Sequence, residues 1–135
     1  MEKSAVFKKM NLKEDVTQLV VLNAPESFEA ELALLAPVEV LREADGVTEL
    51  TFGLAFVQTE TAVSEAAAAL TSKAKGDAHI WMAYPKKSSK KYKSEITRDS
   101  GWAAMGAAGY EPVRQVAIDA DWSALRFRHV DFIKS

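Results

Sequence analysis

The side chains best suited to chemistry follow an apolar segment at residues 78–84. Five lysines and two serines fall within eight positions, interrupted by Tyr92: Lys86, Lys87, Ser88, Ser89, Lys90, Lys91 and Lys93. Ammonium and hydroxyl donors that lie close together can hold an anion such as a phosphate group. The pattern predicts either an anion-binding loop or a solvated basic loop that keeps the chain soluble. Both hypotheses stay open.

The other reactive side chains do not form a recognisable catalytic group. His79 and His129 have no third partner at metal-ligand spacing, so no metal site is predicted. Asp119 and Asp121 could act as a carboxylate pair, but turn chemistry explains two aspartates in a short connection more simply. Ser123 has no identifiable base partner, which leaves nucleophilic catalysis without support. No catalytic residue is therefore predicted.

The composition is typical of one globular domain. The 135 residues are 48% hydrophobic and 27% charged, and the formal net charge is −2. The chain contains no cysteine, which excludes disulfides, thiolate metal sites and a cysteine nucleophile. No apolar run approaches the roughly 18 residues of a membrane span. The first ten residues lack the apolar core of a secretory signal, so a cytoplasmic location is expected.

The charges are distributed unevenly along the chain. Residues 14–65 hold eleven acidic side chains and one basic side chain, which gives −10, whereas residues 86–98 hold six basic and one acidic, which gives +5. Nucleic-acid-binding domains usually carry a basic face with interleaved aromatic residues, so a nucleic-acid partner is disfavoured. A protein partner or a small anionic ligand fits better, and a homo-oligomer is compatible with the sequence.

The hydrophobic pattern predicts alternating strands and helices. Six segments have the continuous or alternating apolar residues of strands: 18–22, 38–41, 49–57, 78–84, 113–118 and 123–130. Helices are expected in three segments: from Pro25 to Pro37, at 60–75 with Thr59 as the N-cap, and from Ser94 or Thr97 to Gly109. Within a single domain 1–135, residues 1–15 are expected to form a mobile or loosely packed arm.

This order of elements predicts an α/β fold. Strands linked by helices run parallel, whereas the last two strands are too close in sequence for a parallel return. We therefore predict an open, mostly parallel six-stranded Rossmann-like sheet in the order 2-1-3-4-6-5, with strand 6 antiparallel and helices on both faces.

Ligands of such sheets bind beyond the carboxyl ends of the strands, where the direction of winding reverses. Here the reversal falls between strands 1 and 3. The candidate ligand-binding residues come from the loops that follow the strands: Asn23, Gln58, Thr59, Lys86, Lys87, Ser88, Ser89 and Lys90.

The final predicted strand leaves one further alternative open. Period-2 alternation places Trp122 and Arg126 on one face of it. If a helix layer covers that face, Trp122 belongs to the core, which is the interpretation that we favour. If the face is open, Trp122 and Arg126 form an aromatic and basic surface patch suited to a partner or ligand.

Three segments resemble a family of short bacterial cytoplasmic proteins of unknown function. They are Trp-Met-Ala-Tyr-Pro-Lys-Lys-Ser at 81–88, Thr-Arg-Asp-Ser-Gly-Trp at 97–102, and residues 112–127, which end in Trp-Ser-Ala-Leu-Arg-Phe. The resemblance spans about residues 78–128 and implies no specific activity. The alternating elements and the final hairpin also look like the second half of a class I S-adenosylmethionine-dependent methyltransferase.

The turn after the first strand departs from the methyltransferase pattern. Those enzymes, like dinucleotide-binding proteins, use a glycine-rich turn that lets the backbone approach the cofactor. Here the residues are Asn23-Ala24-Pro25-Glu26, and no glycine precedes Gly46. No cofactor is therefore expected.

Two functions remain. The favoured hypothesis is a non-enzymatic Rossmann-like module that binds a protein partner or a small anionic ligand. The alternative is a small transferase-like enzyme, a degenerate form of the methyltransferase fold, with its site completed by oligomerisation.

Overall fold

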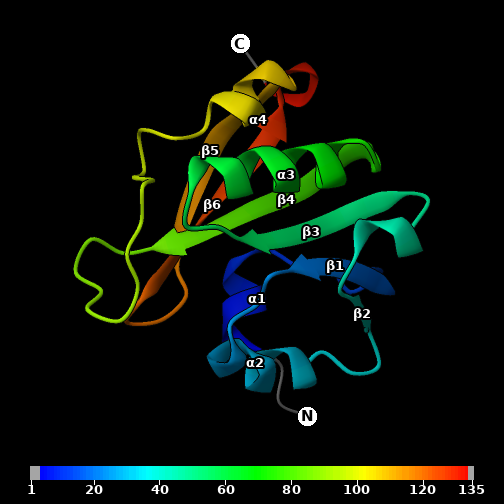
Figure 1. Ribbon diagram of the computed structural model, residues 1–135. Helices are drawn as coiled ribbons and strands as arrows, with labels where there is room; N and C mark the ends of the chain where they lie inside the picture. Colours follow the sequence, from blue (N-terminus) through cyan, green and yellow to red (C-terminus); the bar gives the residue numbers. More distant parts are fainter. Residues whose placement is uncertain (1–3, 134–135) are drawn as a thin grey trace.

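The computed structural model describes residues 4–133, and in it a six-stranded sheet lies between two layers of helices (Figure 1). The strands are β1 (Gln18–Leu22), β2 (Glu39–Leu41), β3 (Leu50–Phe56), β4 (Ala74–Pro85), β5 (Tyr110–Ala117) and β6 (Trp122–His129). The helices are α1 (Ala5–Lys9), α2 (Glu29–Ala33), α3 (Glu60–Thr71) and α4 (Ala103–Ala107), with short 3₁₀ turns at Glu26–Phe28, Ala44–Gly46 and Val130–Phe132.

The sheet has the predicted topology. Its strand order is β2-β1-β3-β4-β6-β5, the pairs among the first four strands are parallel, and β6 is antiparallel to both of its neighbours. In β1, Leu19, Val20 and Val21 are at most 1% exposed. A continuous apolar run can therefore be read as a strand covered on both faces.

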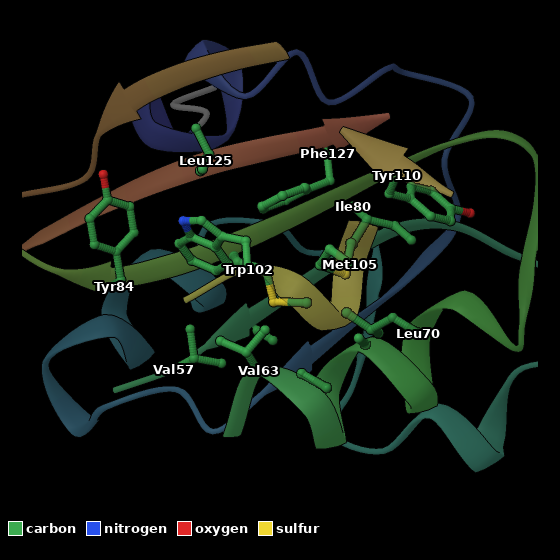
Figure 2. Packing of buried hydrophobic residues seen from close by; sticks show 14 of the residues in the cluster. Val57, Val63, Leu70, Ile80, Tyr84, Trp102, Met105, Tyr110, Leu125 and Phe127 are labelled. Atoms are coloured by element: carbon green, nitrogen blue, oxygen red, sulfur yellow. The ribbon is translucent and has the colours of Figure 1, made fainter. Parts of the chain in front are cut away.

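Each face of the sheet packs against its own pair of helices. On one face, Val63 and Leu70 of α3 and Met105 of α4 pack against Ile80 and Phe127 of the sheet (Figure 2). On the other face, the buried side chains of α1 and α2 join a second cluster that includes residues of β1, β3, β4 and β6: Val6, Phe7, Leu32, Val21, Phe52, Phe56, Trp81 and Ala124. The helices thus occupy both faces, as predicted.

Residues 4–12 are packed, contrary to the expected loose arm. The hydroxyl of Ser4 accepts a hydrogen bond from the backbone N–H of Phe7 and caps α1. Val6, Phe7 and Met10 are buried, and the ring centroid of Phe7 lies 5.8 Å from that of Phe28. The prediction was wrong here because apolar residues at helical spacing give even this short helix a face to bury. Residues 1–3 of the predicted arm lie outside the described residues.

Helix α3 begins as predicted but ends earlier. The Thr59 hydroxyl accepts a hydrogen bond from the Ala62 N–H at 3.0 Å, which confirms the N-cap. The helix was expected to reach residue 75, but Ala74 already pairs with Leu50 as part of β4. Gly76 has a φ of 59° and lies at an irregularity within this strand rather than at the end of a helix. From the pair Leu50–Ala74 to the pair Phe52–His79, β3 advances two residues and β4 advances five, so the irregularity accommodates three extra residues of β4.

The segment before α4 is a loop, which corrects the predicted helix start. Ser94 bonds to the backbone of Ile96, and the backbones of Thr97 and Ser100 bond to each other at 3.1 and 3.4 Å. Short polar side chains that bond to nearby backbone compete with helix formation. The helix therefore begins only at Ala103, whereas its expected terminator, Gly109, follows it in the left-handed conformation.

We predict that Gly109→Ala destabilises the protein. Gly109 has a φ of 89°, and a Cβ atom there would lie 2.9 Å from Nε2 of His129. The strain should lower the free energy of unfolding by about 1–3 kcal/mol, measured by urea denaturation. Gly106→Ala is the control, because its Cβ would meet no atom within 4 Å, and it should be neutral or stabilising by up to about 1 kcal/mol. Equal stability of the two variants would contradict this account.

Candidate functional site

A pocket of about 500 Å³ lies at the carboxyl ends of β1 and β3. It is lined by residues of five segments: Asn23, Pro25, Glu26, Phe56, Gln58, Thr59, Ala62, Tyr92 and Trp122. Its volume falls in the usual range for small-molecule sites. Because the chain reverses its winding between these strands, the pocket occupies the position where ligands of open α/β sheets bind.

The polar rim of the pocket contains three of the predicted ligand residues. Asn23, Gln58 and Thr59 are exposed and line the same pocket. The backbone of this rim is fixed by neighbouring elements. The Gln58 carbonyl accepts a hydrogen bond from the Glu95 N–H at 2.9 Å, and Thr59 caps α3. The structure therefore brings these residues together on a fixed scaffold.

The tight turn after β1 forms without glycine. Asn23 has a φ of 59°, in the left-handed region. Asparagine is one of the few residues besides glycine that enters this region readily. The sequence argument against a cofactor rested on the missing glycine. The turn itself does not need glycine, because Asn23 adopts the left-handed conformation. The argument applies only to the space that the side chain of Asn23 occupies.

The start of the following segment is unsuited to phosphate. Pro25 has no backbone N–H, Glu26 brings a carboxylate, and α2 is only five residues long. A phosphate-binding turn needs several N–H groups at a helix start and no negative charge nearby. Glu26 is the one charged residue among the pocket-lining residues of the described chain. The pocket thus favours neutral or cationic ligands.

Aromatic rings form one wall of the pocket. The ring centroid of Trp122 lies 5.0 Å from that of Phe56 and 4.9 Å from that of Tyr92. Trp122 is 2% exposed, and its Nε1 has no hydrogen-bond partner among residues 4–133. Only 13% of the Arg126 side chain is exposed. Burial of Trp122 is therefore confirmed, and the two residues do not form an exposed patch.

The aromatic wall and Glu26 were not predicted as pocket residues. Trp122 lies opposite Pro85 in the antiparallel pair of β4 and β6, which places its ring at the carboxyl end of β4. The predicted strand order already places strand 6 beside strand 4. Nothing in the sequence indicates the path of the loop that places Tyr92 in the pocket.

Within the basic loop, residues 86–93, only Tyr92 lines the pocket. The predicted residues Lys86, Lys87, Ser88, Ser89 and Lys90 all lie outside its lining. The Ser89 hydroxyl donates to Asp121 Oδ1 at 2.8 Å and accepts from the Tyr92 N–H at 3.1 Å.

Ser89 therefore fixes the loop and positions Tyr92. Among residues 4–133, the five lysines of the loop make no ion pair. The ammonium of Lys91 lies 5.5 Å from the ring centroid of Tyr92.

The remaining candidates have structural explanations. Asp119 Oδ1 accepts hydrogen bonds from the N–H groups of Asp121 and Trp122, at 2.8 and 2.9 Å, so the aspartates act in the turn. Within the described range 4–133, no three histidine, aspartate or glutamate side chains are placed to hold a metal ion. The helices of the same range are too short or too polar to span a bilayer.

A polar cluster occupies the other end of the sheet, on the face covered by α1. Asp77 accepts three hydrogen bonds from Arg128, between 2.6 and 3.1 Å, and these lower the pKa of its carboxyl group. Burial, reinforced by the nearby Arg126 guanidinium, lowers the pKa of His79 from 6.5 to about 4. His79 is therefore neutral at pH 7.

Comparison with solved structures identifies the fold. An S-adenosylmethionine-dependent methyltransferase from Aquifex aeolicus is 18% identical, with a TM-score of 0.58 over 93% of this chain and 88% of that one. A putative type 11 methyltransferase from Sulfolobus solfataricus is 11% identical, with a TM-score of 0.54 over 98% and 83%. The chain has a methyltransferase-like Rossmann fold.

The comparisons do not extend to a sequence family. No protein-family model matches the sequence, and no curated protein matches it significantly. The chain spans 55% of the length of the pyocyanin biosynthetic protein PhzM, which it matches at 10% identity with a TM-score of 0.58. The resemblance to short bacterial proteins stays a prediction.

We predict that adjacent serines of the basic loop differ in importance. Ser89→Ala removes two hydrogen bonds that hold the loop, and it should lower the free energy of unfolding by about 1–2 kcal/mol. It should also change the fluorescence of Trp122, because Tyr92 contacts that indole. Ser88→Ala is the control, since Ser88 is exposed, and it should leave both quantities unchanged. A loss of stability in Ser88→Ala alone would refute this assignment.

We predict that stability rises between pH 4 and pH 6.5 because of His79. Its pKa is about 4 in the folded protein and near 6.5 when unfolded, so the unfolded state binds more protons in this window. Asp77, whose pKa is lowered from 3.8, loses its contribution only below that window. Urea denaturation gives the free energy of unfolding at pH 4.5 and at pH 7. The change in this free energy between the two pH values should be smaller for His79→Gln than for the wild type. An equal change in both proteins would contradict the prediction.

Proposed function

We propose that the chain is a small transferase-like enzyme and that the pocket beyond β1 and β3 binds S-adenosylmethionine. The observation that carries the proposal is the position of this pocket at the switch point of a methyltransferase-like sheet. The Aquifex protein, matched over 88% of its length, is an S-adenosylmethionine-dependent methyltransferase. At 18% identity this likeness supports the fold, so the ligand is argued from the pocket.

The chemistry of the pocket suits a nucleoside that carries a cation and no phosphate. The half-buried ring of Tyr92, packed against Trp122 and through it against Phe56, offers apolar area for a purine ring. Asn23 and Gln58 offer amide groups for ribose hydroxyls. Glu26 provides a negative charge that attracts a sulfonium and repels a phosphate. When bound, S-adenosylmethionine would supply an electrophilic methyl group to a nucleophile of the substrate.

The basic loop would bind the second substrate. Its lysines lie next to Tyr92, outside the pocket, and make no ion pair among the described residues. We assign Lys86, Lys87 and Lys90 to an anionic group of that substrate. Because Asn23, Glu26 and Gln58 are exposed, a second copy of the chain could close the pocket, as the sequence hypothesis of oligomerisation requires.

Calorimetric titration tests the proposal. We expect the wild type to bind S-adenosylmethionine and adenosine but not NAD, whose phosphates meet Glu26. Glu26→Gln should weaken S-adenosylmethionine about fivefold by removing one charge pair, and leave adenosine unchanged. Gln58→Ala should weaken both.

Two controls separate the pocket from the rest of the surface. Glu65→Gln removes an exposed charge of α3 outside the pocket, and it should have no effect. Replacing Lys86, Lys87, Lys90 and Lys91 by serine should also leave S-adenosylmethionine affinity intact. A folded protein that binds neither nucleoside would refute the proposal. Binding without methyl transfer to any acceptor would instead favour a non-enzymatic module.

A further inference from the structure

Four nitrogen atoms on the α1 face of the sheet lack hydrogen-bond partners. Among residues 4–133, five buried side-chain nitrogen or oxygen atoms have no partner, and four of them belong to His79, Trp81 and Arg126. Trp81 and Arg126 lie directly opposite each other in the pair of β4 and β6. His79 is two residues before Trp81, so it is on the same face. The unpaired nitrogens therefore occupy one small area of the sheet.

The chemistry of these atoms calls for an acceptor. The nitrogen atoms of Trp81 and Arg126 can only donate. The two atoms of Arg126 are Nε and Nη2, which form one edge of the guanidinium. That edge makes two parallel hydrogen bonds to a carboxylate or a phosphate. Leaving such donors buried and unpaired destabilises the folded protein.

Asp77 does not satisfy this edge. Its carboxylate accepts hydrogen bonds from Nε and Nη2 of Arg128 at 2.6–3.1 Å, whereas Nη2 of Arg126 lies 3.7 Å from Asp77 Oδ1. The distance to Arg126 permits attraction but is too long for a hydrogen bond. One carboxylate thus lies between two guanidinium groups and pairs fully with one of them.

The charges around the cluster are mostly positive. Arg114 lies opposite Arg126 in the antiparallel pair of β5 and β6. Lys13 is close enough to His79 to help lower the pKa of its ring. Opposing them are Asp77 and the exposed Glu111, which lies opposite Arg128. His79 is neutral at pH 7, so its ring can donate one N–H. The cluster lies close to the surface, because 33% of the Asp77 side chain and 13% of the Arg126 side chain are exposed. The unpaired nitrogens themselves are buried, so an anion reaches them only after these side chains shift.

We propose that Arg126, Trp81 and His79 form a binding site for a small oxyanion such as phosphate or a carboxylate. The oxyanion accepts two hydrogen bonds from the Nε and Nη2 edge of Arg126 and a third from the indole N–H of Trp81. The site lies around His79 and Trp81 in the middle of β4, whereas the pocket proposed for S-adenosylmethionine lies beyond the carboxyl ends of the strands. It does not depend on that proposal.

Thermal unfolding at constant ionic strength tests this site. We compare sodium chloride with sodium phosphate and sodium acetate. An oxyanion at ten times its Kd should raise the Tm by about 4 °C. Arg126→Lys, which keeps the charge but loses the forked edge, should abolish the shift. Trp81→Phe, which keeps an aromatic ring and removes only the N–H, should weaken binding about fivefold.

Two controls locate the effect. Trp102→Phe removes an indole N–H that bonds to the Thr97 carbonyl at 2.8 Å in the other cluster, and it should leave the anion-induced shift intact. The variant with Lys86, Lys87, Lys90 and Lys91 replaced by serine lacks the anion site assigned to the basic loop, so any shift that remains belongs to Arg126. We expect a shift to remain in this variant and to disappear when Arg126→Lys is added to it, which separates the two sites. Equal Tm values in chloride, phosphate and acetate would overturn the proposal and indicate ordered water at Arg126. Loss of the shift in the serine variant would overturn it too.

Discussion

Residues 80–84 of β4 are at most 5% exposed, and they point alternately into two hydrophobic clusters on opposite faces of the sheet. Ile80, Met82 and Tyr84 pack with α3 and α4, whereas Trp81 and Ala83 pack with α1 and α2. Each large side chain buried in this way contributes about 1.5–3 kcal/mol. Because β4 pairs with β3 on one side and with β6 on the other, it joins the two halves of the sheet and packs against both helical layers.

The antiparallel placement of β6 against β4 connects this core to both proposed sites. At the carboxyl end of β4, the register sets Trp122 opposite Pro85, where the indole becomes a wall of the pocket. Four residues further along β6, Arg126 lies opposite Trp81 and carries the unpaired guanidinium edge. Because alternate residues of a strand share a face, one side of β6 supplies both features. Its other side, with Leu125 and Phe127, belongs to the core.

The strands could be predicted from the sequence because their burial is nearly continuous. Apolar runs such as Leu19–Val21 have few structural alternatives once a helix on each face is expected. Prediction failed where local hydrogen bonds compete with helix formation, as at residues 94–101, and where Gly76 continues a strand instead of ending a helix. It also failed for α1, whose apolar face has only three residues.

The candidate site was partly predictable for a similar reason. Asn23, Gln58 and Thr59 follow strand ends, and strand order alone brings such loops together. Tyr92 reaches the pocket through a loop held by Ser89 and Asp121, and those contacts depend on the distant turn before β6. Contacts between residues that lie more than thirty positions apart leave no periodic pattern in a sequence.

The turn after β1 decides how any ligand of the pocket is recognised. In phosphate-binding α/β proteins, a helix start supplies backbone N–H groups, and glycine lets the ligand approach them. Here Asn23 keeps the left-handed turn, but Pro25 removes one donor, Glu26 adds a negative charge, and α2 is too short to build a dipole. Recognition must therefore come from side chains, which means rings for apolar area, amides for hydroxyls and a carboxylate for positive charge. The oxyanion site that we propose lies instead near Arg126, whose guanidinium edge is buried and has no hydrogen-bond partner among residues 4–133.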